Sequence, residues 1–381
     1  MIPMVSVLAA PRIVTPEGVL APGWIRVAGD RIDAVGAGAP APDDAVHQLD
    51  GAWVVPGFVD VHVHGGAGGS YTTAHAEDAR RAAAFHRTRG TTSTVASVVT
   101  APLEEMAAAV ATLAGLVAEG VLDGVHLEGP WLNPARRGAQ SERDMRAPDP
   151  AELERLLAAG DGAVRMVTIA PELPGGLDLV RRAAAAGLVV AVGHSDASAA
   201  QAEEAFAAGA THVTHLFNAL RPLHHREPGV AGAALAHPTV TCELICDGIH
   251  VHDGAVRLAA RAAGAHRLLA ITDATAAAGM GDGTYRLGPM TVVVRGGVAE
   301  LEDGSSLAGS VLTMDRAFAR LVRDVGLEVE EAAAMTAGTP ARVLGLRDVG
   351  VIASGSRADL AVLDEDLGLR AVMAAGAWVS P

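Results

Sequence analysis

The chain has 381 residues, half of them hydrophobic, and a formal net charge of −15. A strongly acidic chain is a poor ligand for nucleic acid and anionic membrane surfaces, and no apolar run here nears the ~18 residues of a membrane-spanning helix, so neither partner is expected. All 29 basic residues are arginines, which excludes lysine Schiff-base chemistry, a P-loop and a metal bridge made by a carbamylated lysine.

The cysteines and the N-terminal sequence predict a cytoplasmic location. Cys242 and Cys246 are too few for a disulfide framework, and we interpret them as small buried residues rather than soft metal ligands. The opening sequence MIPMVSVLAAPRIV lacks a basic segment and leads directly into strand-like sequence, so we expect no signal peptide.

Both ends of the chain have the pattern of short β-strands. Residues 1–52 contain strand-like segments broken by Gly, Pro and Asp turns, with no helical periodicity. Residues 345–381 return to this pattern after two helical segments. We therefore predict one small discontinuous β-sandwich domain, built from residues 1–52 and 345–381, beside a larger domain over residues 53–344.

The larger domain alternates apolar runs with Ala-rich segments that favour helices. The eight runs are 58–64, 92–99, 122–129, 164–172, 188–196, 211–219, 241–250 and 268–274. Eight is the number of strands in a closed (β/α)8 TIM-like barrel, an α/β fold. A doubly wound open sheet is the structural alternative. A hairpin insertion is predicted at 285–305, after the eighth run.

Polar side chains stand at the ends of these runs. His62 and His64 share one face of the first run, because successive side chains of a strand point to opposite faces. In a parallel barrel, the carboxyl ends of the strands form the active site. Buried imidazoles and carboxylates cost free energy unless they are paired or bound to a metal, so we predict a metal site. The residues concerned are His62, His64, Glu128, His194, His215 and Asp273, with Asp247 and His250 just after Cys246.

The remaining histidines are not assigned to the metal site. His126 shares the inward face with Glu128. Two roles for His126 remain as alternatives: a hydrogen bond to a metal ligand, or a direct function in the site. His212 begins a strand, at the opposite end of the barrel from the site. Five others lie in helical or loop sequence and are expected at the surface: His75, His86, His237, His252 and His266.

Taken together, these motifs resemble the amidohydrolase superfamily and, within it, the deacetylases of N-acetylglucosamine 6-phosphate. The resemblance covers nearly the whole chain and rests on PGFVDVHVHG, HLEGPWLNPARRGAQ, GHSDA, THLFNAL followed by REPG, CDGIHV, ITDATAAAG and SLAGS, in that order. It implies metal-dependent hydrolysis of the acetamide of N-acetylglucosamine 6-phosphate to glucosamine 6-phosphate and acetate. The alternatives are another amidohydrolase, such as an N-acyl-amino-acid deacylase, and a non-catalytic sugar-phosphate sensor.

The resemblance also implies a divalent metal centre, with zinc as the expected ion and one or two ions per subunit. Glu128, His194 and His215 would hold the principal ion. His62 and His64 would hold a second, with Glu128 bridging and Asp273 nearby. Asp273 is further implied as the group that takes a proton from the attacking water and delivers it to the departing amine.

For the sugar-phosphate substrate, the family pattern carries over to Ala139, Gln140, Asn218, Ala219, Arg226, His250 and Leu307. Gln140 is a departure, because the family commonly has histidine there; glutamine keeps a donor and an acceptor but cannot titrate. Arg226 is the implied phosphate contact, and in this family it tends to come from the neighbouring subunit, so a homodimer is expected. His250 is an implied stabiliser of the developing oxyanion.

Overall fold

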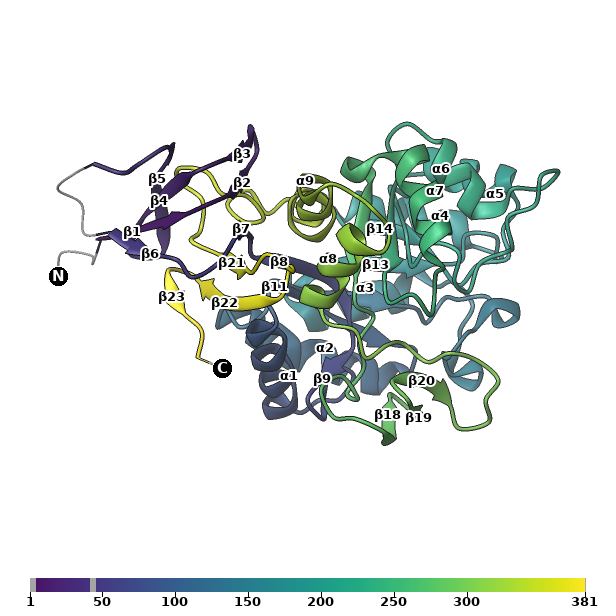
Figure 1. The fold of residues 1–381 in the computed structure, drawn as a ribbon. Helices are drawn as coiled ribbons and strands as arrows, with labels where there is room; N and C mark the ends of the chain where they lie inside the picture. Colours follow the sequence, from purple (N-terminus) through teal and green to yellow (C-terminus); the bar gives the residue numbers. More distant parts are fainter. Residues whose placement is uncertain (1–4, 42–45, 381) are drawn as a thin grey trace.

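The computed structural model describes residues 5–41 and 46–380, so residues 1–4, 42–45 and 381 of the predicted small domain lie outside it. Figure 1 shows a large unit of mixed helices and strands, with strands from both chain ends gathered at one side. Among the described helices, none combines the length and the apolar character that crossing a bilayer requires.

The centre of the large unit is a sheet of eight parallel strands whose spatial order follows the chain from β17 to β8. The strands are β8 (Phe58–Val63), β11 (Thr91–Val99), β12 (Gly124–Glu128), β13 (Val164–Ile169), β14 (Val189–Val192), β15 (His212–Val213), β16 (Thr241–Ile245) and β17 (Leu268–Ile271). Each lies within or overlaps one of the eight predicted runs. Almost all their residues are buried, as expected of strands covered on both faces.

The two outer strands of this sheet meet and close it. The Asp273 amide, just after β17, donates to the His62 carbonyl in β8 at 2.9 Å. The Thr272 hydroxyl donates to the Asp60 carboxylate at 2.5 Å. The predicted (β/α)8 barrel is confirmed, and the open-sheet alternative is wrong. Closure brings the carboxyl end of β8 next to that of β17, which places His62 and His64 beside Asp273.

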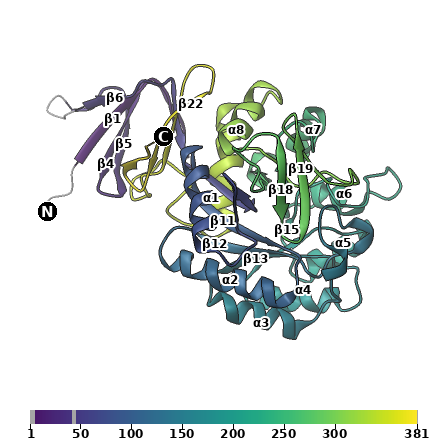
Figure 2. The same ribbon diagram turned by 90° about the horizontal axis from the view of Figure 1, so that it is seen from below.

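Helices surround the barrel (Figure 2). They are α1 (Ala76–Thr88), α2 (Leu103–Ala118), α3 (Pro150–Gly160), α4 (Gly176–Ala185), α5 (Ala199–Ala207), α6 (Gly229–Ala236), α7 (Asp253–Ala263), α8 (Met314–Arg323), α9 (Val329–Ala333) and α10 (Thr339–Val343). In α2, for example, Met106, Val110 and Leu113 recur at helical spacing and are fully buried. Helix α2 thus presents an apolar face to β11 and β12.

Strands from the two chain ends form two further sheets. The first contains β1 (Val5–Ala10), β4 (Gly23–Ala28), β5 (Arg31–Ala37) and β6 (Val46–Gln48). The second contains β2 (Ile13–Thr15), β3 (Gly18–Leu20), β7 (Trp53–Pro56), β21 (Leu360–Leu363), β22 (Leu369–Ala374) and β23 (Ala377–Trp378). One apolar cluster includes residues of both sheets, so they pack as a sandwich.

Strand β7 refines the proposed division of the chain. It lies beyond position 52 but pairs with β21, for example Val55 with Ala361. We therefore propose that the N-terminal part of the small unit continues to Pro56, where the first barrel strand follows almost immediately.

The predicted insertion after the eighth barrel strand is present and contains three strands. The antiparallel strands β18 (Gly283–Leu287), β19 (Met290–Arg295) and β20 (Val298–Leu301) form one sheet. Its apolar face packs on Val99 at the end of β11. The insertion therefore covers the carboxyl end of the barrel, where the predicted site lies.

His86 contradicts the expectation of a surface residue. Its side chain in α1 is fully buried, and Nε2 donates to the Gly65 carbonyl at 2.8 Å. A Cβ on Gly65 would lie 2.3 Å from the Gly69 carbonyl oxygen, so the turn after His64 needs glycine there and His86 supports it from behind. Sequence alone does not predict this contact, because helical periodicity does not say which face of α1 meets the turn.

Burial makes His86 acid-sensitive. It lowers the His86 pKa to about 4, although the bond to Gly65 opposes the shift. Unfolded chains bind this proton below a pH of about 6.5, so stability present above that pH is lost as the pH falls towards 4. Between these values, His86→Gln should flatten the pH dependence of the unfolding free energy by about 1.4 kcal/mol per pH unit. Urea unfolding of both proteins at several pH values tests this, and parallel curves would contradict it.

Candidate metal centre and active site

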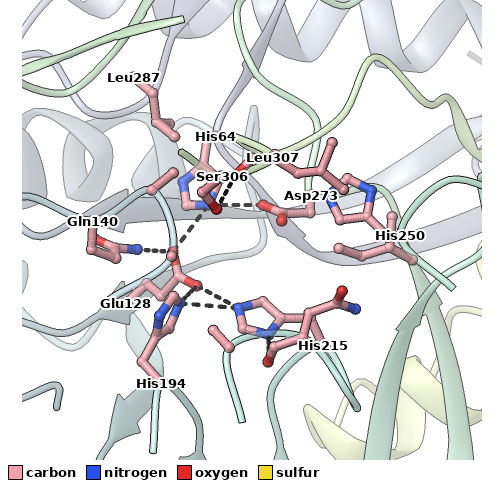
Figure 3. A pocket seen from close by; sticks show the side chains of 16 residues that line it. His64, Glu128, Gln140, His194, His215, His250, Asp273, Leu287, Ser306 and Leu307 are labelled. Carbon is pink, nitrogen blue, oxygen red and sulfur yellow. Dashed lines mark hydrogen bonds and ion pairs between the residues drawn. The ribbon is translucent and has the colours of Figure 1, made fainter. Parts of the chain in front are cut away.

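A cavity of about 190 Å³ opens at the carboxyl end of the barrel. Figure 3 shows side chains from several strand ends directed into it. Its lining comprises His64, Glu128, Gly138, Ala139, Gln140, His194, His215, Asn218, Ala219, Ile245, His250, Asp273, Leu287, Ser306, Leu307 and Gly309.

Glu128, the last residue of β12, is the centre of the site (Figure 3). Its Oε1 lies 3.1 Å from Nε2 of both His194 and His215, and its Oε2 lies 3.2 Å from Nε2 of His64. Burial raises the pKa of this carboxyl, but the His62 charge and hydrogen bonds from the imidazoles outweigh burial and hold its pKa well below the usual range. Glu128 is therefore an anion that touches histidines from three other strand ends.

The outer nitrogens of the histidines fix which nitrogen faces the centre. The Nδ1 atoms of His64, His194 and His215 donate to the carbonyl oxygens of Ser97, Arg136 and Asn218, at 3.2, 2.9 and 3.1 Å. A carbonyl can only accept, so each Nδ1 carries a proton, and Nε2 is the ring nitrogen that faces the centre of the site.

These inward Nε2 atoms crowd one another. The Nε2 atoms of His194 and His215 are 3.1 Å apart, and those of His62 and His64 are 3.2 Å apart. Two lone pairs at such distances repel unless a proton or a metal cation lies beside them. The arrangement therefore fits a cation between the rings.

The donor atoms form two groups that suit a divalent metal. His62, His64 and Asp273 offer ligand atoms within 4.8 Å of one another, as do Glu128, His194 and His215. Imidazole nitrogens and carboxylate oxygens are ligands typical of zinc and related ions, and three protein ligands leave a position for water or substrate. The chain thus has a buried divalent-metal site, and Glu128 lies between its two groups.

Asp273 follows β17 and faces the histidines of β8. Its Oδ1 lies 3.1 Å from Nε2 of His64 and 3.7 Å from Nε2 of His62. Burial raises the pKa of Asp273, but the His64 hydrogen bond and the charges of both imidazoles bring it below its usual value. An ionised carboxylate at the cavity wall can accept a proton.

Backbone strain is concentrated in these residues. His194, His215 and Asp273 have φ values of 47°, 25° and 48°, in the left-handed region that side chains disfavour. Such conformations cost of order 1–3 kcal/mol each and persist where the surroundings impose them. Each follows a barrel strand, and the turn directs its side chain into the cavity.

His250 reaches the cavity from the loop after β16. Its Nδ1 lies 2.7 Å from Oδ2 of Asp247, and its backbone amide donates to Oδ1 of the same carboxylate. Burial raises the pKa of Asp247, but its bonds to His250 and the His250 charge lower it overall. Asp247 thereby fixes the ring of His250, whose other nitrogen is left to contact a substrate.

Gln140 contacts Glu128 as well as lining the cavity. Its Nε2 donates to Oε2 of Glu128 at 2.6 Å, and its Oε1 accepts from the Thr100 amide at 2.8 Å. Both ends of the carboxamide are therefore engaged by the protein. The sequence predicted a substrate contact here; the structure adds a hydrogen bond that orients Glu128.

The other predicted substrate residues divide into two sets. Ala139, Asn218, Ala219 and Leu307 line the cavity with Gln140 and His250. Arg226 does not: it lies in an exposed loop, where its guanidinium donates to Nε2 of His225 at 3.1 Å. The described part of the chain places no arginine in the cavity lining.

Three buried polar residues around the site were missed or left open by sequence reasoning. Glu243 in β16 contacts His62, and Asp60 in β8 contacts Thr272. Burial raises the Asp60 pKa to about 7, against hydrogen bonds from Thr272 that lower it. His126 bonds to Ser97 and Thr168 and packs its ring on that of His62. An acid inside an otherwise apolar run, as in TCELIC, was the available signal for Glu243.

Comparisons with known proteins agree with this geometry. Residues 53–379 match the model of the amidohydrolase family. The structure of a mutant of the N-acetyl-D-glucosamine-6-phosphate deacetylase from Mycobacterium smegmatis, in complex with N-acetyl-D-glucosamine-6-phosphate, is similar to this chain: the sequences are 47% identical and the TM-score is 0.96, over 99% of this chain and 100% of that one. The N-acetylglucosamine-6-phosphate deacetylase of Bacillus subtilis (strain 168) is 35% identical over 93% of this chain and 92% of its own length. The N-acetylgalactosamine-6-phosphate deacetylase of Escherichia coli O157:H7 is 38% identical over 99% and 100%.

Proposed function

The chain belongs to the amidohydrolase family, and on that basis we propose that it is a metal-dependent deacetylase of N-acetylglucosamine 6-phosphate. Hydrolysis of the acetamide yields glucosamine 6-phosphate and acetate. The observation that carries the proposal is the convergence of His64, Glu128, His194, His215 and Asp273 in one cavity. A sensor that only binds sugar phosphate would not need an ionised carboxylate such as Asp273 at the cavity wall.

The protein's own residues divide the chemistry among them. The two groups, His62 with His64 and Asp273 and Glu128 with His194 and His215, would hold a divalent cation, which would supply polarisation of the amide carbonyl and a lower pKa of water. Asp273 takes a proton from the water that attacks the carbonyl carbon, and then delivers it to the sugar nitrogen as the carbon–nitrogen bond breaks. His250, held by Asp247, donates to oxygen atoms of the substrate as charge develops. Zinc fits this set of nitrogen and oxygen donors, and two ions per subunit match the two groups.

The phosphate requires a cationic partner that the cavity of one chain lacks. Its lining, as far as the chain is described, contains histidines but no arginine. Arg226 stands on an exposed loop, where its guanidinium donates a hydrogen bond to the neighbouring His225. We propose a homodimer in which Arg226 serves the other subunit's cavity, since guanidinium binds phosphate through two parallel hydrogen bonds.

The free thiols of Cys242 and Cys246 fit the proposed cytoplasmic location.

The epimer at carbon 4 of the sugar defines a second candidate substrate. The Escherichia coli relative named for N-acetylgalactosamine 6-phosphate is 38% identical and matches its whole length to this chain. A pocket must place a donor or acceptor at one of the two hydroxyl orientations to separate the epimers. Activity on the galactose epimer is therefore the specific alternative.

Acetate release tests the proposal, measured on N-acetylglucosamine 6-phosphate, on its galactose epimer and on unphosphorylated N-acetylglucosamine, all with added zinc. We expect the highest kcat/KM for the first and a large loss without phosphate. A preference for the galactose epimer would support the alternative. Equal, feeble rates on all three would contradict a sugar-phosphate substrate, and the search would move to N-acyl amino acids.

A further inference from the structure

The carboxylate of Glu243 lies behind the metal site and does not line the cavity. It is completely buried in the middle of β16, in an otherwise apolar stretch. Burying an ionised carboxylate costs several kcal/mol unless donors surround it. Such groups surround Glu243, which lies within hydrogen-bond distance of the imidazoles of His62 and His212 and accepts from the backbone amide of His215. Glu243 is therefore an anion kept where an apolar residue would ordinarily stand.

One oxygen of Glu243 contacts both halves of the site. Oε2 lies 2.9 Å from Nδ1 of His62, which belongs to the group with His64 and Asp273. The same atom accepts from the backbone amide of His215 at 3.1 Å, and His215 belongs to the group with Glu128 and His194.

The other oxygen of Glu243 is held by the barrel. Oε1 lies 3.1 Å from Nε2 of His212, whose Nδ1 lies 2.6 Å from the hydroxyl of Thr241. This explains why His212, which sequence reasoning placed at the wrong end of the barrel for the site, is a buried polar residue. It fixes the carboxylate from the side opposite the cavity.

These contacts determine the state of His62. A carboxylate on Nδ1 holds a proton there, so Nε2 is the nitrogen that faces Glu128, His64 and Asp273. A negative partner on the outer nitrogen also makes an imidazole a stronger ligand. The bond to the His215 amide, in turn, supports the strained turn with φ of 25° that aims this ring inward.

We propose that Glu243 is a positioning residue that holds one ligand of each group, so that both halves of the metal site depend on it. The proposal rests on the metal-dependent function proposed above. Strand β16 would then support the metal site through Glu243, in addition to lining the cavity with Ile245. Removing the charge should weaken metal binding at the whole centre rather than at one group.

The test is zinc binding to the metal-free protein, measured by competition with a chromophoric chelator. Glu243→Gln keeps the size and an acceptor oxygen but removes the charge, and we expect about 10–100-fold weaker zinc binding, the usual cost of losing a group that orients ligands. Glu243→Leu, without any acceptor, should bind zinc still more weakly. The visible spectrum of the cobalt-loaded Glu243→Gln protein should also change, because it reports ligand geometry.

The matched control is Glu152→Gln. Glu152 is a largely buried carboxylate in α3 that accepts from Trp131 and Arg146, away from the cavity. The Glu152→Gln protein should keep the wild-type zinc affinity and the wild-type cobalt spectrum, whatever the substitution does to the stability of the fold. Wild-type affinity in a folded Glu243→Gln protein would overturn the inference alone. A wild-type protein that binds no zinc would overturn the proposed metal centre and the inference together. Should Glu243→Leu not fold, Glu243→Gln still decides.

Discussion

Asp273→Asn should lower kcat by about 10²–10⁴-fold, the range that a positioned acid–base group contributes. In the wild type, Oδ1 of Asp273 lies 3.1 Å from Nε2 of His64. The amide of the variant keeps the shape of the side chain and an oxygen that can face His64, but it cannot accept the proton of the attacking water. KM should change little. Steady-state kinetics of acetate release, with zinc content measured on the same preparations, checks this result.

Zinc content separates two roles of Asp273, because its carboxylate belongs to one of the ligand groups. If it acted only as a ligand, raising the zinc concentration would restore turnover to Asp273→Asn. We expect no such recovery. Asp253→Asn is the matched control, since Asp253 at the start of α7 pairs with Arg320 at 2.8 Å and does not line the cavity. Substantial turnover in Asp273→Asn would remove the assignment.

Periodicity explains why the barrel was predictable from the sequence. Runs such as that containing His62 and His64 alternate at a strand's spacing, and Ala-rich segments separate the runs. In a parallel barrel all strands end on one side, so residues at strand ends must converge. The positions of Glu128, His194 and Asp273 at strand ends are therefore enough to predict that these residues lie together.

Other features depend on distances that a sequence does not contain. Glu243 stands in the body of a strand, and only the closed barrel shows that one of its oxygens meets residues from two other strands. Likewise, Gln140 was read through its position in a motif, whereas its hydrogen bond to Glu128 depends on how the loop after β12 folds back. His86 is a similar case, because which helix face meets the Gly65 turn is a property of packing.

Glu128→Gln should weaken zinc binding by more than the 10–100-fold that is typical of losing an orienting group, and added zinc should not restore activity at accessible concentrations. Glu128 is the residue that contacts imidazoles of both ligand groups, through Oε1 to His194 and His215 and through Oε2 to His64. A neutral amide offers one oxygen in place of two charged ones and turns N–H donors toward nitrogens that must coordinate. Equilibrium zinc titration measures the effect directly.

Gln140→Leu is the companion variant, since it removes the donor to Glu128 at 2.6 Å and leaves every ligand in place. We expect its zinc affinity to fall between those of the wild type and Glu128→Gln. The same variant tests the sequence interpretation of Gln140 as a substrate contact. A raised KM with unchanged zinc affinity would favour substrate binding, whereas weaker zinc binding with nearly constant KM would show that Gln140 acts through Glu128. Because both amide ends of Gln140 are already bonded within the protein, we expect the second result.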